Sequence, residues 1–506
     1  MRVAIRHHLV NIPTWVVLCM LCVLPSSICA GQPIHHEIHV LLNPTQHFLK
    51  VENTITFPKH ILSKTKRQLD FLIHGGLQLS TPTKGTTLTR KQGPQAAIPL
   101  DNYTLTVPTN TQTIILRYEG EIYHPLVAEG EEYARSFTET PGLISPKGIY
   151  LAGSTAWYPQ FNNHLMSFTI DIDLPENWSA ISQGKRTIFN DQNNQVQIRW
   201  ESPQPQDEIF LIGGTFTEYR KQAGPVEIMA FLQTPDAALA NTYLTTTAQY
   251  LEMYNTLLGP YLYPKFALVE NFWETGYGMP SFTLLGPKVI RFPFIRHSSY
   301  PHEILHNWWG RGVYVDFQSG NWSEGLTAYL ADHLIKEQRG TAINHRRNAL
   351  QQYADYVADA KDFPLTEFRS RHSAVTQAIG YGKTLMFFHM LRQQLGDEAF
   401  VLGLRTFYQD NTFRHATYED LQQAFEQTSR QNLSTEFTQW ITRPGAPVLR
   451  VSNVHVQSNG STYRLTATLE QTQPGPPYTL HIPIAVSSTE QTLTYQTTVS
   501  MNALQH

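Results

Sequence analysis

The chain has 506 residues, of which 41% are hydrophobic and 16% are charged, and its formal net charge is −3. This composition excludes a disordered or fibrous chain, because so much apolar surface can offset the entropy lost on ordering. The charge lacks the basic excess typical of proteins that bind nucleic acid or an anionic membrane, so we expect a globular protein of several domains with no nucleic-acid partner.

The first 30 residues have the layout of a secretory signal peptide. Two arginines precede an apolar run from Trp15 to Leu24, and Ile28-Cys29-Ala30 offers a small residue for cleavage. The run is shorter than the roughly 20 residues that cross a bilayer as a helix. We therefore expect residues 1–30 to direct export to the periplasm or the extracellular space, with an uncleaved anchor as the alternative. All three cysteines lie in this segment, so a cleaved chain would contain no disulfide.

Residues 31–222 consist of short runs in which apolar and polar side chains alternate. Ile38-Val40-Leu42 and Phe168-Ile170-Ile172-Leu174 are examples, and clusters of Pro, Gly and Asn separate such runs. A period of two is typical of half-buried strands. The pattern predicts an N-terminal domain of antiparallel β-strands.

Residues 223–445 begin with mixed elements and become helical. Strands are predicted at 226–229, 266–270 and 282–285, and helices at 237–258, 299–310, 321–338, 341–360, 376–395, 397–409 and 417–430. Strands followed by helices favour an α+β arrangement of layers. Alternation returns after Pro447, so residues 446–506 are predicted to form a small β module with no later segment apolar enough to cross a membrane.

His302-Glu303-Ile304-Leu305-His306 is an HExxH motif inside the predicted helix 299–310. Residues four apart lie on one face of a helix, so both imidazoles can bind a single metal ion. Glu303 lies beside them, where its carboxylate can take a proton from a water molecule. The alternative is an ordinary helix with two solvated histidines.

A zinc site that performs hydrolysis commonly uses two His and one carboxylate, and leaves one position for water. Glu324, which opens the next predicted helix, is the first choice for the carboxylate, and Asp316 and Asp332 are weaker choices. Glu324 could instead be a capping residue, because it follows Asn321 at the spacing of a capping box. The spacing of residues leaves both roles open.

The segment from His302 to Gly310, HEILHNWWG, resembles the HExxH-x-W-x-G motif of the M1 zinc aminopeptidases, a gluzincin family. The later Asn321-Trp322-Ser323-Glu324-Gly325 resembles the NEG segment of that family. The resemblance implies that His302, His306 and Glu324 bind one zinc ion per chain and that Glu303 is the general base. Seventeen residues separate His306 from Glu324, one fewer than is usual in the family.

A third segment, from Ala378 to Thr384, is similar to the Y-x-K-G element of the same family, with Thr384 at the position of the final glycine. The resemblance implies that Tyr381 donates a hydrogen bond to the oxyanion of the transition state. Without the resemblance, Tyr381 would be interpreted as a core aromatic residue.

The resemblance also implies a multidomain α+β fold. After the signal peptide it implies an N-terminal antiparallel β saddle domain at 31–222, a thermolysin-like catalytic domain at 223–445 and a small C-terminal β-sandwich at 446–506. The large C-terminal helical domain of many members is not expected, because only about 60 residues follow the catalytic segment.

In this family a G-x-M-E-N strand binds the substrate backbone, and its Glu binds the free α-amino group. One alignment matches Tyr277-Gly278-Met279-Pro280-Ser281, which implies that Gly278 and Met279 bind substrate and puts Pro280 at the position of the amine-binding carboxylate. A second alignment matches Val269-Glu270-Asn271 to M-E-N and keeps the carboxylate, but loses the preceding glycine. Glu270 and Glu274 are therefore candidate replacements for the missing carboxylate.

We predict an exported zinc metallopeptidase of the M1 aminopeptidase type that acts on peptides and has no membrane span after cleavage. A zinc endopeptidase, or a zinc hydrolase of another substrate, would use the same residues without binding an amine, and Pro280 favours it. A non-catalytic peptide-binding protein is the third candidate. We would expect such a protein to lack Glu303, Tyr381 or a metal ligand, and the sequence lacks none of them.

Overall fold

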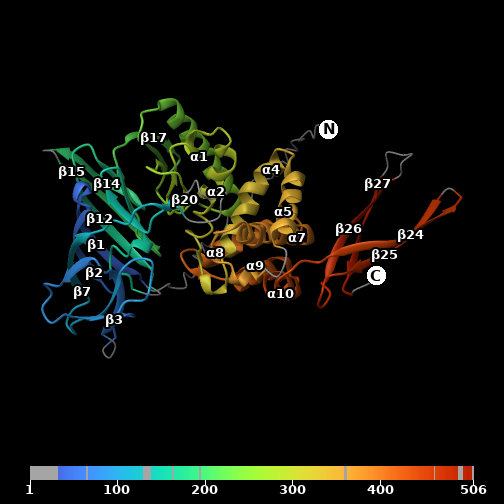
Figure 1. Cartoon of the computed structure of the whole chain (residues 1–506), viewed down its shortest axis with the longest axis horizontal. Helices are drawn as coiled ribbons and strands as arrows, with labels where there is room; N and C mark the ends of the chain where they lie inside the picture. Colours follow the sequence, from blue (N-terminus) through green and yellow to red (C-terminus); the bar gives the residue numbers. More distant parts are fainter. Residues whose placement is uncertain are drawn as a thin grey trace, which may run out of the picture.

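We describe the protein from a computed structural model. The described residues are 32–503 except 64–66, 129–137, 162–163, 193–194, 358–361, 461 and 488–493. The predicted signal peptide, residues 1–30, lies outside them. Figure 1 shows a β-rich part on the left, a helical part in the centre and two β-hairpins on the right. The mixed α/β multidomain architecture predicted from the sequence is confirmed at this level.

The N-terminal β-rich region is built on a seven-stranded sheet in the order β14-β15-β12-β1-β2-β7-β4. Alternate side chains of β1 are buried, which is the period of two expected from the sequence. β1 runs parallel to β12 and antiparallel to β2. The strands are β1 (Ile34–Asn43), β2 (Phe48–Thr56), β4 (Leu77–Ser80), β7 (Thr113–Glu121), β12 (Met166–Pro175), β14 (Lys185–Gln192) and β15 (Gln195–Gln206).

Smaller sheets complete this region. A four-stranded sheet has the order β10-β11-β16-β13, a three-stranded sheet the order β3-β6-β5, and β8 pairs with β9. Their bounds are β3 (Gln68–His74), β5 (Thr87–Lys91), β6 (Leu100–Thr106), β8 (Val127–Ala128), β9 (Thr138–Glu139), β10 (Gly142–Ser145), β11 (Gly148–Leu151), β13 (Ser179–Ile181) and β16 (Leu211–Gly214).

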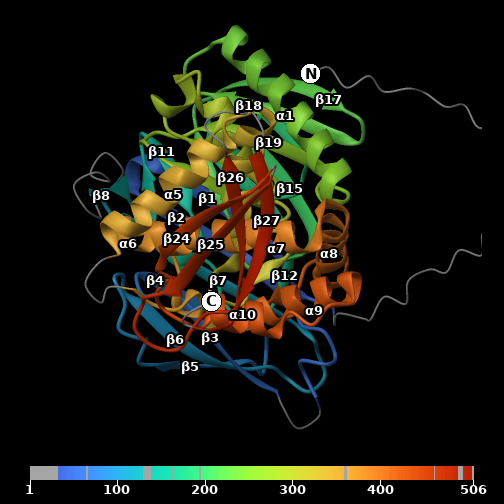
Figure 2. The ribbon, with the colours of Figure 1, turned by 90° about the vertical axis from the view of Figure 1, so that its right-hand side faces the viewer.

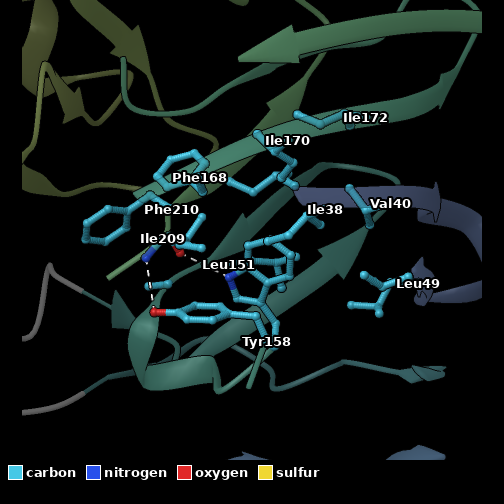
Figure 3. Close-up of a cluster of buried hydrophobic side chains, with 14 of the residues drawn as sticks. Ile38, Val40, Leu49, Leu151, Tyr158, Phe168, Ile170, Ile172, Ile209 and Phe210 are labelled. Carbon is cyan, nitrogen blue, oxygen red and sulfur yellow. Dashed lines mark hydrogen bonds between the residues drawn. The ribbon is translucent and has the colours of Figure 1, made fainter. Parts of the chain in front are cut away.

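A continuous hydrophobic core lies between these sheets. Figure 3 shows Ile38 beside Ile170, and these two residues face each other across β1 and β12. The backbone N–H of Ile209 donates a hydrogen bond of 3.1 Å to the Tyr158 hydroxyl inside the core. Burying each aliphatic side chain of this kind stabilises the fold by about 1.5–3 kcal/mol.

A five-stranded sheet separates this core from the helices, in the order β17-β18-β19-β21-β20. One face, with Phe231 and Val269, packs on the N-terminal core, and the other, with Ala230 and Leu268, packs on the helices. The strands are β17 (Thr217–Ala223), β18 (Val226–Leu232), β19 (Lys265–Glu270), β20 (Gly276–Met279) and β21 (Phe282–Leu285). Because β17 pairs with β18, this sheet begins before residue 223, where the catalytic domain was predicted to start.

The helical region matches most of the predicted helices. The helix predicted at 299–310 is shorter, because the chain turns after residue 306 and Gly310 adopts a φ of +99°. The segment predicted at 321–338 is helical throughout but contains one π-helical turn. The elements are α1 (Ala237–Leu258), α2 (Ser299–Leu305), α3 (Trp322–Thr327), the π-helical turn η7 (Ala328–His333), α4 (Leu334–Gln338), α5 (Ala342–Tyr356), α6 (Ala374–Gln377), the π-helical turn η9 (Ala378–Lys383), α7 (Thr384–Leu395), α8 (Asp397–Asn411), α9 (Tyr418–Ser429) and α10 (Ser434–Ile441), and β22 (Tyr314–Val315) pairs with β23 (His415–Ala416) between them.

The C-terminal strands form two hairpins, β24 (Leu449–Asn459) with β25 (Thr462–Gln471) and β26 (Leu480–Ser487) with β27 (Thr494–Met501). Figure 2 shows both hairpins in front of the helical region. Gln439 and Trp440 of α10 contact the connection between the hairpins, through a hydrogen bond to Thr479 and ring stacking on Tyr478. The predicted β module is present as strands, and no strand hydrogen bonds join the two hairpins within the described residues. No helix of the described chain has the length and apolar character needed to cross a membrane.

Candidate metal centre and active site

The metal centre starts on α2, which is held in place by its apolar face. Tyr300, Ile304 and Leu305 are fully buried against the helical core. The remaining face presents His302, and His306 follows the last helical residue. Because the two histidines lie four positions apart, their imidazoles point to the same side of the helix.

His302, His306 and Glu324 bring one donor atom each to within 4.8 Å of one another. Glu324 Oε2 lies 3.3 Å from His302 Nε2 and 3.6 Å from His306 Nε2. No other group of three His, Cys, Asp or Glu side chains within the described ranges converges in this way. Two imidazoles and one carboxylate form the donor set of a hydrolytic zinc site.

The outer nitrogen of each histidine has a partner that orients the ring. His306 Nδ1 lies 3.0 Å from the Trp309 carbonyl oxygen, and His302 Nδ1 lies 3.1 Å from Asp332 Oδ2. A carbonyl oxygen only accepts, so Nδ1 of His306 carries the proton and its Nε2 keeps a lone pair for a metal. Asp332, a weaker choice for the third ligand, thus contacts the outer nitrogen of His302 and orients its ring. This pattern of outer partners is typical of metal-binding histidines.

Glu324 faces the histidines and does not cap α3. The Asn321 side chain makes no capping hydrogen bond, and its amide donates to the Arg369 carbonyl instead. The capping-box alternative is therefore absent from the structure. His306 and His302 lower the pKa of Glu324 well below its usual value, although burial opposes this shift. Asp316, the other weaker choice, caps the short turn after β22 by accepting from the Gln318 N–H.

α3 approaches the π-helical turn η9 closely at Gly325. A Cβ at Gly325 would lie 2.2 Å from the Cβ of Thr384, so a larger residue at 325 would clash. Thr384, which replaces the usual glycine of the Y-x-K-G element, thus fills the space that Gly325 leaves. The contact packs α3, which carries Glu324, against the start of α7, which directly follows the turn η9 that carries Tyr381.

Tyr381 lies beside the metal ligands. Its ring stacks on the His302 ring with centroids 6.1 Å apart and an interplanar angle of 18°. Burial raises its pKa well above the usual value, and Glu324 adds to the shift, so the phenol stays protonated and can donate a hydrogen bond. The Arg371 guanidinium carbon lies 5.9 Å from the Tyr381 ring centroid. Sequence reasoning did not identify Arg371, because no motif contains it.

Glu303 belongs to α2, and its carboxylate approaches the edge strand β20. A Cβ at Gly278 would lie 2.9 Å from Glu303 Oε2 and 3.1 Å from His306 Cβ, so only glycine permits this approach. Burial raises the pKa of Glu303, whereas His302 and His306 oppose the shift. A carboxylate with a raised pKa is a stronger base than an exposed one, which suits proton transfer.

β20 is an edge strand beside the candidate metal ligands, because its only strand partner among the described residues is β21. Gly278 and Met279, the predicted substrate-binding residues, lie on this strand. Pro280 is buried, so its side chain does not line an open groove. The following Ser281 has a φ of 67°, and its N–H donates to Asn307 Oδ1 at 2.7 Å. The position expected for an amine-binding carboxylate is therefore part of a buried turn.

Glu270 and Glu274, the candidate replacements for that carboxylate, already have partners. Glu270 is 2% exposed, pairs with Arg291 at 2.5 Å and accepts from the Gln233 N–H. It also lies on β19, which has strand partners on both sides and no edge for a peptide. Glu274 accepts from the backbone N–H groups of Lys288 and Val289. These contacts argue against either residue as the amine site.

Residues 298–440 match the model of the Peptidase family M1 domain. The chain is 26% identical over 157 residues to "Aminopeptidase N" of Lactococcus lactis, a match that covers 29% of this chain and 18% of the relative. It is 28% identical over 200 residues to "Aminopeptidase N" of Haemophilus influenzae, covering 37% and 22%. The matches thus span only about a fifth of the length of these curated relatives.

The fold is similar to solved structures of an M1 zinc metallopeptidase from Deinococcus radiodurans. One has a TM-score of 0.61 at 18% identity and covers 83% of this chain and 95% of that chain. Another, of a mutant bound to a Tyr-Ser-Ala substrate, has a TM-score of 0.62. The M1 resemblance predicted from the sequence is confirmed. The family and the His-His-Glu group together imply zinc, as predicted.

Proposed function

Because residues 298–440 match the model of the Peptidase family M1 domain, we propose that the protein is a zinc-dependent peptidase of the aminopeptidase type. The observation that carries the proposal is the convergence of His302, His306 and Glu324 next to Glu303 and Tyr381. We extend it to the finer architecture expected from the resemblance, a saddle-like β domain, a thermolysin-like catalytic domain and a C-terminal β-sandwich. Export through residues 1–30 remains part of the proposal.

The metal ligands of this chain fit zinc, because both Nε2 atoms and one carboxylate oxygen face a common point. When bound, zinc would polarise the scissile carbonyl and acidify the water that attacks it. His302 and His306 would hold the ion through Nε2, while Asp332 and the Trp309 carbonyl fix their rings.

Glu303 is the general base of the proposed mechanism. Its buried carboxylate would take a proton from the attacking water and deliver that proton to the leaving amine. The phenol of Tyr381 would donate a hydrogen bond to the oxygen on which negative charge develops, since its raised pKa keeps it protonated. A donor aimed at a developing oxyanion in a dry site supplies about 3–4 kcal/mol of transition-state stabilisation.

The free edge of β20 would hold the peptide substrate. An extended peptide can pair with the backbone of Gly278 and Met279, as peptides do when they add a strand to a sheet edge. Gly276 and Gly278 lie against Glu303, so a peptide on this edge would pass close to the general base.

A second candidate function, a zinc endopeptidase, is favoured by the contacts around Pro280. Pro280 is buried, and Glu270 and Glu274 are bound to Arg291 and to backbone N–H groups. An endopeptidase needs no carboxylate for a substrate amine, whereas an aminopeptidase needs some group that binds it.

The tripeptide Tyr-Ser-Ala and its N-acetylated form distinguish the two candidates. We would incubate each with the zinc-loaded protein, with a chelator-treated sample and with the Glu303→Gln variant as controls. Cleavage of only the free tripeptide supports the aminopeptidase, and cleavage of both forms supports the endopeptidase. If a zinc-loaded protein cleaves neither form nor a longer peptide, the peptidase proposal is wrong.

A further inference from the structure

The segment between β21 and α2 exposes two phenylalanines that the proposed peptidase function does not use. Phe292 is 46% exposed and Phe294 is 60% exposed. Their rings stack with centroids 5.4 Å apart and an interplanar angle of 10°. Pro293 between them is also exposed, so residues 292–294 form an apolar tip. We call residues 288–297 the aromatic turn.

Buried side chains and hydrogen bonds from α1 hold the aromatic turn in place. It consists of two short helical turns, and each contributes one buried isoleucine, Ile290 and Ile295. The hydroxyls of Tyr243 and Tyr250 on α1 donate to the carbonyl oxygens of Ile290 and Arg296, both at 2.8 Å. Two apolar rings are thus exposed to water although the segment around them is held in place. An exposed apolar tip of this kind points to an interaction site.

Glu270 and Glu274 contribute to this support. Glu270 pairs with Arg291, and Glu274 accepts from the backbone N–H of Lys288 at 3.0 Å. The Gly286 N–H also donates to the Thr275 carbonyl at 2.8 Å, directly before β20. The two carboxylates therefore hold the aromatic turn, and the Gly286–Thr275 hydrogen bond connects it to the start of β20.

Basic side chains surround the apolar tip, although the whole chain has a net charge of −3. Lys288, Arg291 and Arg339 are exposed, and Arg296 is half-buried. No carboxylate within the described ranges pairs with Arg296 or Arg339. Both arginines lower the pKa of His297, in addition to the effect of burial, which indicates that they lie close to it. Arg291 is paired with Glu270, so Lys288, Arg296 and Arg339 supply the positive charge near the tip.

We propose that the aromatic turn docks the protein on an anionic lipid surface. Phe292 and Phe294 would enter the boundary between headgroups and acyl chains, while Lys288, Arg296 and Arg339 contact the anionic headgroups. Apolar burial combined with electrostatic attraction is the usual basis of interfacial membrane binding. Exposed apolar rings next to basic side chains fit an anionic lipid surface, whereas an extended peptide needs a groove or a strand edge. The inference does not rest on the proposed peptidase function.

Vesicle binding tests this proposal. We would mix residues 31–506, which include every described residue, with vesicles of phosphatidylcholine alone or with 30% phosphatidylglycerol, and measure the bound fraction by flotation. The truncated chain avoids the apolar run Trp15–Leu24, which could bind lipid by itself. We expect binding to the anionic vesicles that is at least tenfold stronger than to the neutral ones and that weakens as salt increases.

Two sets of variants separate the contributions. The double variant Phe292→Ser/Phe294→Ser should reduce binding at least tenfold, whereas Phe317→Ser, which removes a 52% exposed phenylalanine elsewhere, should leave it unchanged. The double variant Lys288→Gln/Arg296→Gln should weaken binding and flatten its salt dependence. Equal melting temperatures would establish that the variants are folded, and the charge variant serves alone if the Phe variant unfolds.

Three results would overturn the proposal. The first is no binding to anionic vesicles above that to neutral ones. The second is equal binding by the wild-type chain, the Phe variant and the charge variant. The third is binding of an acidic, apolar peptide by the aromatic turn when vesicles are not bound, which would assign the surface to a protein partner.

Discussion

The candidate metal centre and the end of β20 lie side by side but differ in how closely they match the M1 motifs. At the metal centre, His302 and His306 each have an outer partner, and Glu324 faces both. At the end of β20, the position expected for an amine-binding carboxylate is Pro280, which is buried in a turn. The donor set of a hydrolytic zinc site is present, whereas the position expected for an amine-binding carboxylate holds a proline.

In the proposed function, hydrolysis and recognition of a substrate end thus depend on different parts of the fold. In the proposed function, hydrolysis depends on spacings along helices α2 and α3, which local hydrogen bonds and packing keep constant. Recognition of a substrate end depends on a strand edge and its turn, where a small change redirects side chains without moving the helices. Substitutions in each region test whether the two regions are as separate as the structure indicates.

The largest effect is expected from Glu303→Gln. The amide has nearly the same shape as the carboxylate but cannot take a proton, so peptide cleavage should fall by about 10³-fold or more. The bound zinc, measured by atomic absorption, should stay at one ion per chain, because Glu303 is not one of the three ligands. Glu252→Gln on α1 is the control for an exposed glutamate. Cleavage at the wild-type rate would remove Glu303 from the mechanism.

A smaller loss is expected from Tyr381→Phe. Removing one donor to the oxyanion should lower kcat by about 10²–10³-fold, with KM changed little because the phenol acts mainly in the transition state. Tyr495→Phe, at a 68% exposed position on β27, is the matched control. A rise in KM with unchanged kcat would instead make Tyr381 a residue that binds the substrate in its ground state.

Asp332→Asn tests the support behind the metal centre. The variant keeps the shape but loses the charge next to His302 Nδ1, and outer partners of this kind are worth about 10–100-fold in metal affinity. Competition with a chromogenic chelator would measure that affinity. Asp316→Asn is the control, because Asp316 caps a turn away from the ligands and should leave zinc affinity unchanged. If Asp316→Asn has the larger effect, the ligand assignment is wrong.

Features set by local spacing along the chain were predicted well from the sequence. The HExxH spacing places two side chains on one helix face whatever surrounds the helix, and the alternation of Ile38, Val40 and Leu42 predicts one buried face of a strand. The structure has both features. Local periodicity therefore predicted the two histidines of the candidate metal centre and most elements of secondary structure, whereas the family resemblance supplied the choice of Glu324.

Features that depend on distant parts of the chain were not predictable in this way. The strand Gly276–Met279 contains two glycines and has no strand pattern, and it exists because it pairs with β21 and packs on α2. The Trp309 carbonyl supports His306, and no side-chain pattern reveals a backbone acceptor. Helix α10 is only eight residues long, too short for its period to stand out. The partners of Glu270 and Glu274 likewise come from other segments.

The smallest predicted effect concerns the junction between the N-terminal region and the metal centre, where Asp207 lies 3.4 Å from Arg311. Burial raises the pKa of Asp207 to about 7, although Arg311 opposes the shift. Between about pH 4 and pH 7 the folded chain holds this proton and the unfolded chain does not, so the free energy of unfolding decreases as pH rises through that range.

Asp207→Asn cannot titrate and should therefore lack this decrease. Relative to the wild-type chain, its free energy of unfolding should rise by about 1–2 kcal/mol between pH 5 and pH 8, as measured by urea unfolding at each pH. The exposed Asp410→Asn is the control and should follow the wild-type curve. Parallel curves for Asp207→Asn and the wild-type chain would mean that Arg311 keeps Asp207 ionised throughout. The junction would then be held by a permanent ion pair, which does not respond to pH.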